Sequence, residues 1–90
     1  MPPVGPEALD TLQPLIRQLR GIPQLRERQP GIFYLLNQAF VHFHVDGGGL
    51  FADLKKGSGS GFDRYPVDTP PQQRSFIDEA RRRAAKLADD

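Results

Sequence analysis

The chain has 90 residues, enough for one domain with a single modest core. Twelve basic and eleven acidic residues give a formal net charge of +1, so no bulk attraction to nucleic acid or to an anionic membrane is expected. Cysteine is absent, which excludes disulfides and thiolate metal sites, and no apolar run approaches the ~18 residues of a membrane helix. We expect a single domain over residues 1–90, located in the cytoplasm, with residues 1–5 and 88–90 frayed.

The first predicted element is a helix over residues 7–20. Its apolar residues recur at helical spacing: Leu9, Leu12, Leu15, Ile16 and Leu19. Pro14 either kinks this helix or marks its effective start, because proline lacks an N–H and clashes with the preceding turn. Gly21 and Pro23 end the helix. The polar residues 24–30 are predicted to form a loop or a short edge strand.

Four antiparallel strands follow, over residues 32–36, 39–45, 50–55 and 62–67. Two-residue turns at Asn37-Gln38 and Gly47-Gly48 join the first three strands, and a flexible Gly-Ser loop over residues 56–61 leads to the fourth. The last helix opens at Thr69, with a proline at its first position and Gln72 completing a capping box. The predicted fold is therefore α+β, a two-layer α-β-β-β-β-α sandwich with both helices on one face of a four-stranded meander.

Pairing the strands by these turns, with Lys55 opposite Phe62 across the Gly-Ser loop, gives the predicted sheet two distinct faces. The same register places Phe33, His42, Asp53 and Arg64 in one row across the four strands. The face expected to pack on the helices carries Ile32, Tyr34, Leu36, Val41, Phe43, Val45, Leu50, Ala52, Leu54, Tyr65 and Val67. The opposite face carries the residues that we single out as ligand-binding or interface candidates, namely Phe33, Phe40, His42, His44, Phe51, Asp53 and Arg64. This second face is too aromatic for plain exposure and too charged for a sealed core, so we expect something to cover it.

Two histidines on this face are candidate metal ligands. The pattern His42-x-His44-x-Asp46 directs three side chains to one side of a strand, and imidazole with carboxylate suits zinc, iron or manganese. The same letters open the metal motif of metallo-β-lactamase-like hydrolases, but that motif continues with a histidine where this chain has Gly47. The alternative interpretation is structural, with His42 hydrogen-bonded to Asp53 and His44 packed on Phe51. It requires no cofactor, and it is favoured by the small number of ligands.

No catalytic residue is assigned from the sequence. His42 and Asp53 resemble a general base with its orienting carboxylate, but such a pair needs a nucleophile or a bound water within reach. The serines lie on the Gly-Ser loop or in the last helix, and none has the G-x-S-x-G setting of a hydrolase. The sequence therefore favours a non-enzymatic role.

The leading functional hypothesis is a binding or interaction module that forms a homodimer through the aromatic sheet face. A monomer of this size has little material with which to cover a second apolar face. The alternative hypothesis is a small-ligand or divalent-metal site on His42, His44, Asp53 and Arg64. Nucleic acid is a disfavoured partner, because acidic residues dilute the basic run at residues 81–83.

Residues 19–54 resemble a class of small bacterial α+β domains. The matching features are Gly21-Ile22-Pro23 after a helix, the strand Ala39-Phe40-Val41-His42-Phe43-His44, a glycine turn and Leu50-Phe51-Ala52-Asp53-Leu54. The segment is most similar to the luciferase-domain-like family and, more loosely, to YjbR-like proteins. This resemblance implies a fold and carries no established chemistry.

Overall fold

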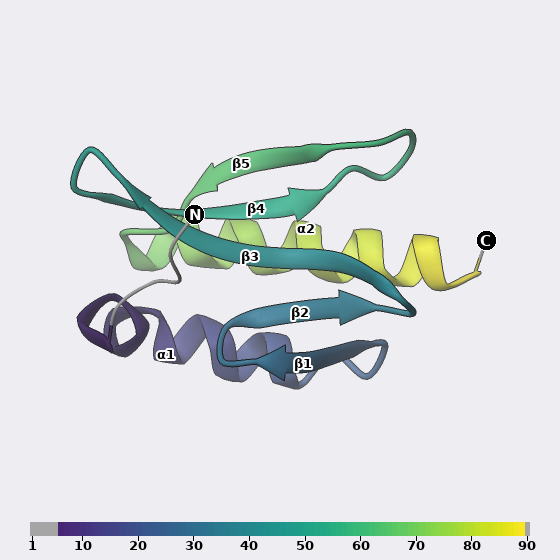
Figure 1. Ribbon diagram of the computed structural model, residues 1–90, viewed down its shortest axis with the longest axis horizontal. Helices are drawn as coiled ribbons and strands as arrows, with labels where there is room; N and C mark the ends of the chain where they lie inside the picture. The colour runs from purple at the N-terminus through teal and green to yellow at the C-terminus, as the bar shows by residue number, and fades with distance from the viewer. Residues whose placement is uncertain (1–5, 90) are drawn as a thin grey trace.

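The computed structural model of the chain describes residues 6–89, which form two helices and one five-stranded antiparallel sheet. In chain order the elements are α1 (Pro6–Arg20), β1 (Leu25–Gln29), β2 (Ile32–Leu35), β3 (Gln38–Asp46), β4 (Gly49–Lys55), β5 (Phe62–Pro66) and α2 (Pro70–Asp89). The strands follow one another in the sheet in the order β1-β2-β3-β4-β5. Both helices lie against the same face (Figure 1). The predicted α+β class and its helix-first, helix-last order are confirmed.

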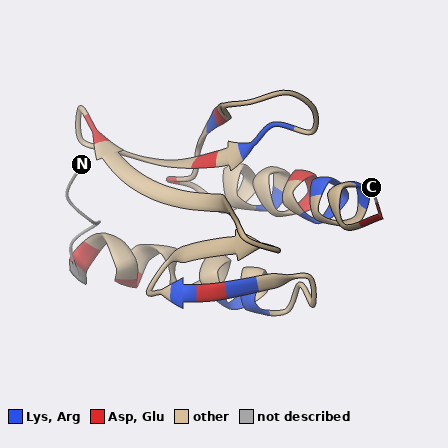
Figure 2. Cartoon of the chain, turned by 45° about the vertical axis from the view of Figure 1, so that its right-hand side comes forward, with Lys and Arg blue, Asp and Glu red and all other residues tan. Residues whose placement is uncertain are grey.

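The sheet has five strands, and the prediction of four was wrong. The additional strand is β1, in the segment that the sequence left open between a loop and an edge strand, and it pairs antiparallel with β2. Its Leu25 packs against the core, while Arg26, Glu27 and Arg28 alternate in sign along the sheet edge (Figure 2). Charged side chains of this kind make an edge strand a poor template for pairing with another chain.

The connection from β2 to β3 differs from the predicted one by a single residue. Leu35 pairs with Gln38, so the turn consists of Leu36 and Asn37 rather than Asn37 and Gln38. Leu36 has a φ of 57° and is 69% exposed, although it was predicted to face the core. Moving the turn by one residue exchanges the two faces of β2, since side chains alternate with period two. Leu35 is therefore buried in the core, and Tyr34, which was predicted to pack on the helices, lies on the opposite face of the sheet.

A β-bulge in β3 accompanies this shift and changes the position of two phenylalanines. Phe33 pairs with Val41 and Tyr34 with Ala39, which leaves Phe40 as the extra residue of the bulge. Phe33 and Phe40 are both buried in the core. The prediction that they lie on the opposite face was therefore wrong, and neither residue belongs to the candidate site.

The β3–β4 hairpin has the predicted register. Val41 pairs with Leu54, and the pairing continues to Asp46 and Gly49, with Gly47 and Gly48 as the turn. Both turn glycines have positive φ, as a type I′ turn requires. At the far end of this hairpin Val45 is half exposed, although it was predicted to face the core. The pairing of β4 with β5 is also as predicted, with Lys55 opposite Phe62.

The core lies between the helices and the inner face of the sheet. Its largest side chains are Leu12, Leu15, Ile16, Leu19, Phe33, Phe40, Val41, Leu54, Val67, Phe76 and Ile77. α1 runs continuously with Pro14 inside it. α2 begins with the predicted capping box, in which the Gln72 N–H donates to Thr69 Oγ1 and the Thr69 N–H donates to Gln72 Oε1.

The helix α2 extends further along the chain than predicted. α2 continues to Asp89, so residues 88 and 89, which were expected to fray, are helical. The predicted fraying of residues 1–5 and 90 lies outside the described residues. Neither helix within residues 6–89 is long and apolar enough to cross a membrane.

Candidate metal-binding site

Three adjacent strands bring the predicted polar row together on the outer face, which is the face of the sheet opposite the helices. His42 on β3 pairs with Asp53 on β4, and Asp53 pairs with Arg64 on β5. His44 lies two residues along β3 on the same side and pairs with Phe51. Paired residues in neighbouring antiparallel strands have Cβ atoms about 5 Å apart. The row of His42, Asp53 and Arg64 is thus a direct consequence of the hairpin register.

Asp53 lies between the two imidazole rings. Its Oδ2 is 3.7 Å from His42 Nδ1 and 3.5 Å from His44 Nδ1. One possible ligand atom from each of the three residues lies within 4.8 Å of those of the other two. We call His42, His44 and Asp53 the HHD cluster. Asp53, rather than the Asp46 of the His-x-His-x-Asp pattern, is its third member.

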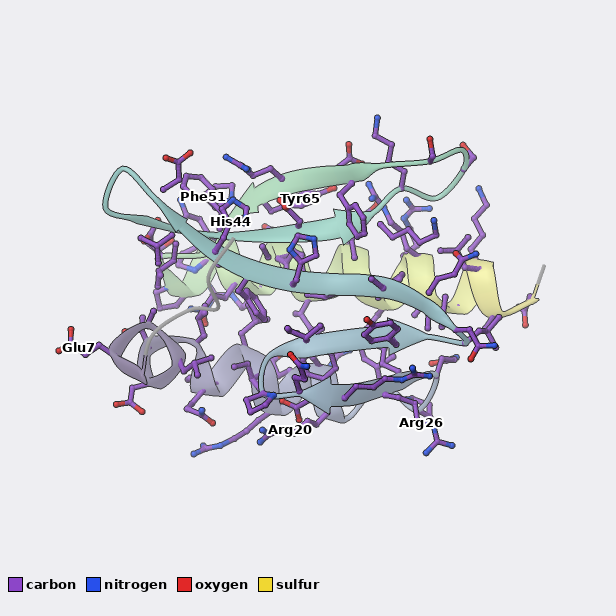
Figure 3. The ribbon with its side chains drawn as sticks, viewed as in Figure 1. Glu7, Arg20, Arg26, His44, Phe51 and Tyr65 are labelled. Atoms are coloured by element: carbon purple, nitrogen blue, oxygen red, sulfur yellow. The ribbon has the colours of Figure 1, made fainter. Side chains whose placement is uncertain are left out.

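His44 is the most unusual residue of the HHD cluster. It is 2% exposed, and its ring stacks on Phe51 with centroids 5.8 Å apart (Figure 3). Neither of its ring nitrogens has a hydrogen-bond partner within residues 6–89, because the approach to Asp53 lacks hydrogen-bond geometry. Leaving a buried polar group unpaired costs about 1–3 kcal/mol. A buried histidine of this kind requires a reason other than packing.

Arg64 provides the positive charge beside the HHD cluster. Its Nε lies 3.6 Å from Asp53 Oδ1, and its Nη1 donates to Asp46 Oδ2 at 3.1 Å. The guanidinium lies over the Phe51 ring, 5.5 Å from its centroid. Arg64 therefore faces both Asp53 and Asp46 while its side chain remains half exposed.

The spacing of the HHD cluster is close to that of a metal site. Two ligands of a tetrahedral zinc ion lie about 3.4 Å apart, given metal–ligand bonds of about 2.1 Å. The two carboxylate–imidazole distances are within a few tenths of an ångström of this value. The third pair of donors, on His42 and His44, lies within 4.8 Å, so the two rings would have to move for all three donors to bind one ion. At least one coordination position would then remain for another ligand.

One further residue contacts the HHD cluster and was missed as a site residue. Phe62 on β5 lies edge-on to His42, with ring centroids 5.0 Å apart, and is 39% exposed. The predicted pairing of Lys55 with Phe62 already placed it on this face, so the register was the signal that could have found it.

The densest charge network of the described residues lies elsewhere, on α2. Hydrogen bonds from Arg82, and then from Arg83, lower the pKa of Glu79 to about 2. Arg83 is buried and also contacts Asp63, the Tyr65 hydroxyl and the Lys55 carbonyl. This network joins α2 to β4 and β5, and its hydrogen bonds hold the helix against the sheet.

Comparison of the chain with protein-family models, with curated proteins and with solved structures finds no match in any of the three. The chemistry of the HHD cluster is therefore the basis on which a function can be inferred.

Proposed function

We propose that this protein binds a divalent transition-metal ion through His42, His44 and Asp53. The observation that supports this most strongly is His44, a buried imidazole that lies beside a carboxylate and whose two nitrogens have no hydrogen-bond partner among the residues that the structure describes. A coordinate bond to one nitrogen would offset the cost of burying the ring. Asp53, which lies beside both histidines, would supply the third ligand of the metal ion.

The donor set selects the class of metal. Two imidazoles with one carboxylate suit zinc, iron, manganese and related ions, whereas calcium and magnesium prefer sites made of oxygen atoms alone. His44 is buried against Phe51, and the side chain of Asp53 is 16% exposed. A partly dehydrated carboxylate of this kind attracts an ion more strongly than a fully solvated one.

The proposal is tested by titrating the chelator-treated protein with Zn²⁺ and with Co²⁺ in a calorimeter. We expect one equivalent of metal to bind to the wild-type protein, and at least 100-fold weaker binding to His44→Leu and Asp53→Asn. Asp78→Asn is the matched control, because it removes an exposed carboxylate on α2. Absence of wild-type binding, or equal binding by His44→Leu, would contradict the proposal.

We also propose, as a second candidate function, that the outer face binds a second copy of this chain. In support, Phe62 is exposed on this face, Tyr34 and Phe51 are half-buried, and both sheet edges are protected from pairing. The three central residues of β1 are charged and β5 ends in Pro66, so an approach of two copies by their sheet edges is disfavoured. The outer face of the sheet is therefore the apolar surface through which a second copy would bind.

Light scattering coupled to size-exclusion chromatography, with chelator present, tests this second candidate. We expect a wild-type dimer, and a monomer for Phe62→Glu. Leu36→Glu is the matched control, since it places the same charge on an exposed leucine at the β2–β3 turn. A wild-type monomer over the whole concentration range would refute self-association.

A further inference from the structure

Arg64 has a position that the proposed metal site does not explain. It supplies no metal ligand, yet its guanidinium lies beside Asp53 on one side and Asp46 on the other. These contacts engage Nε and Nη1, and Nη2 makes no hydrogen bond within residues 6–89. A guanidinium carries five N–H donors in a planar fork, so most of its donors stay available on the open side of the sheet.

The net charge of the site reverses when a metal ion binds. With neutral histidines, the two carboxylates of Asp46 and Asp53 and the guanidinium of Arg64 sum to one negative charge. A divalent ion converts this to one positive charge. Lys55, two residues along β4 from Asp53, adds a positive charge on the same face, so that with Lys55 counted the empty face is neutral and the loaded face carries two positive charges. The loaded site therefore attracts an anion.

An ion held by Asp53 would lie next to Arg64, whose Nε is 3.6 Å from Asp53 Oδ1. The side chain of His42 is 37% exposed, so this end of the HHD cluster would be accessible to a further ligand. Arg64 lies next to Asp53 across the β4–β5 pair. An anion with two oxygens can place one oxygen on the metal and accept hydrogen bonds from Arg64 with the other.

We propose that the metal-loaded site binds a small oxyanion between the metal ion and Arg64, a proposal that rests on the proposed metal binding. The ligand class is a carboxylate or a phosphate, whose paired oxygens match the guanidinium fork. The rival role for Arg64 is that of a simple counter-ion to Asp53. A counter-ion would affect the affinity for the metal and would leave the affinity for the anion unchanged.

Cobalt-loaded protein separates these roles, because the visible spectrum of Co²⁺ reports both its binding and any change in its ligands. The protein is first titrated with Co²⁺ and then with inorganic phosphate or acetate. We expect a saturable spectral change with one or both anions, and a loss of anion affinity of at least tenfold in Arg64→Gln. Arg64→Lys should be intermediate, since it keeps the charge without the fork. Arg82→Gln, on the exposed face of α2, is the control and should match the wild type.

The outcomes distinguish this proposal from the one on which it rests. Protein that takes up no Co²⁺ contradicts the metal site itself. A cobalt spectrum that neither anion changes overturns the oxyanion proposal and leaves metal binding intact. Equal anion affinities of wild type and Arg64→Gln likewise overturn it, and would assign Arg64 the role of counter-ion.

Discussion

His44 is the residue at which stability and the proposed function oppose each other. Its buried nitrogens have no partner within residues 6–89, although an apolar side chain of similar volume would fill the same space beside Phe51. Residues that weaken the fold in this way are expected where a ligand is bound.

We predict that His44→Leu leaves the metal-free protein as stable as the wild type or more stable, by up to about 2 kcal/mol. The gain comes from removing an unpaired polar group from a buried position. Urea unfolding in the presence of chelator measures it. A loss of stability larger than about 1 kcal/mol would show that the imidazole has a structural role, and would weaken the case for a metal ligand.

Leu36 is a second residue that is expected to reduce the stability of the fold. Its φ of 57° lies in the left-handed region, and most of its side chain is exposed. We predict that Leu36→Gly raises the free energy of unfolding by about 1 kcal/mol, since glycine adopts this backbone conformation without steric strain. Thermal unfolding at neutral pH measures the change, and Leu35→Gly, in the core beside it, should destabilise the protein instead.

At the scale of elements, the polar row was predictable and its aromatic surroundings were only partly so. The triple glycine at residues 47–49 sets the register of β3 against β4, and that register places His42 beside Asp53. Phe33 and Phe40 were misplaced because a one-residue change of turn and a bulge both alter which side chains face the core. Neither the shifted turn nor the bulge can be recognised from the pattern of hydrophobic residues in the sequence.

The strand β1 illustrates the same limit for a whole element. Its five residues include one apolar side chain, so neither alternation nor β-propensity identifies it. The strand is held by pairing with β2 and by the bonds of Glu27 to Arg20 and to the Gly31 N–H. These contacts form only in the folded chain, which is why the sequence left the segment open.

Arg83 links α2 to the sheet, and we predict that Arg83→Met costs about 2 kcal/mol. The substitution keeps the apolar stem but removes hydrogen bonds to the Lys55 carbonyl, the Tyr65 hydroxyl and Glu79. Arg82→Met should cost about 0.5 kcal/mol or less, because Arg82 is an exposed partner of the same Glu79. Denaturant unfolding of both variants gives the comparison, and equal effects would contradict the role of Arg83 as a tether.

Two carboxylates with lowered pKa values, Glu79 and Glu27, predict the acid sensitivity of the fold. The folded-state pKa of Glu79 is about 2, below its ordinary value of 4.5, and hydrogen bonds from Arg20 lower the pKa of Glu27 in the same direction. Stability from a lowered carboxyl pKa is present above the unfolded value and is lost as the pH falls toward the folded value. We therefore expect the melting temperature to fall between pH 5 and pH 2, and to fall less steeply in Glu79→Gln.

At the scale of the whole molecule, the fold divides its tasks between two faces. The helices lie against the inner face of the sheet (Figure 1) and form the core with it, whereas the outer face carries the HHD cluster, Arg64 and the half-exposed aromatic residues. All three members of the HHD cluster lie on the β3–β4 hairpin, whose two strands are both inside the sheet rather than at its edges. Metal binding to this hairpin should therefore stabilise the whole domain against unfolding rather than a single loop.

This arrangement leads to a prediction for thermal unfolding. A ligand that binds only the folded state adds about 2.7 kcal/mol when its concentration is 100 times its dissociation constant. For a domain of this size each kcal/mol raises the melting temperature by about 4–8 °C. We expect Zn²⁺ at such a concentration to raise the melting temperature of the wild type by more than 10 °C, and to leave His44→Leu unchanged. Asp78→Asn should respond as the wild type does. An equal rise in His44→Leu would show that the ion acts at another site, and the HHD cluster would then be a structural feature of the sheet.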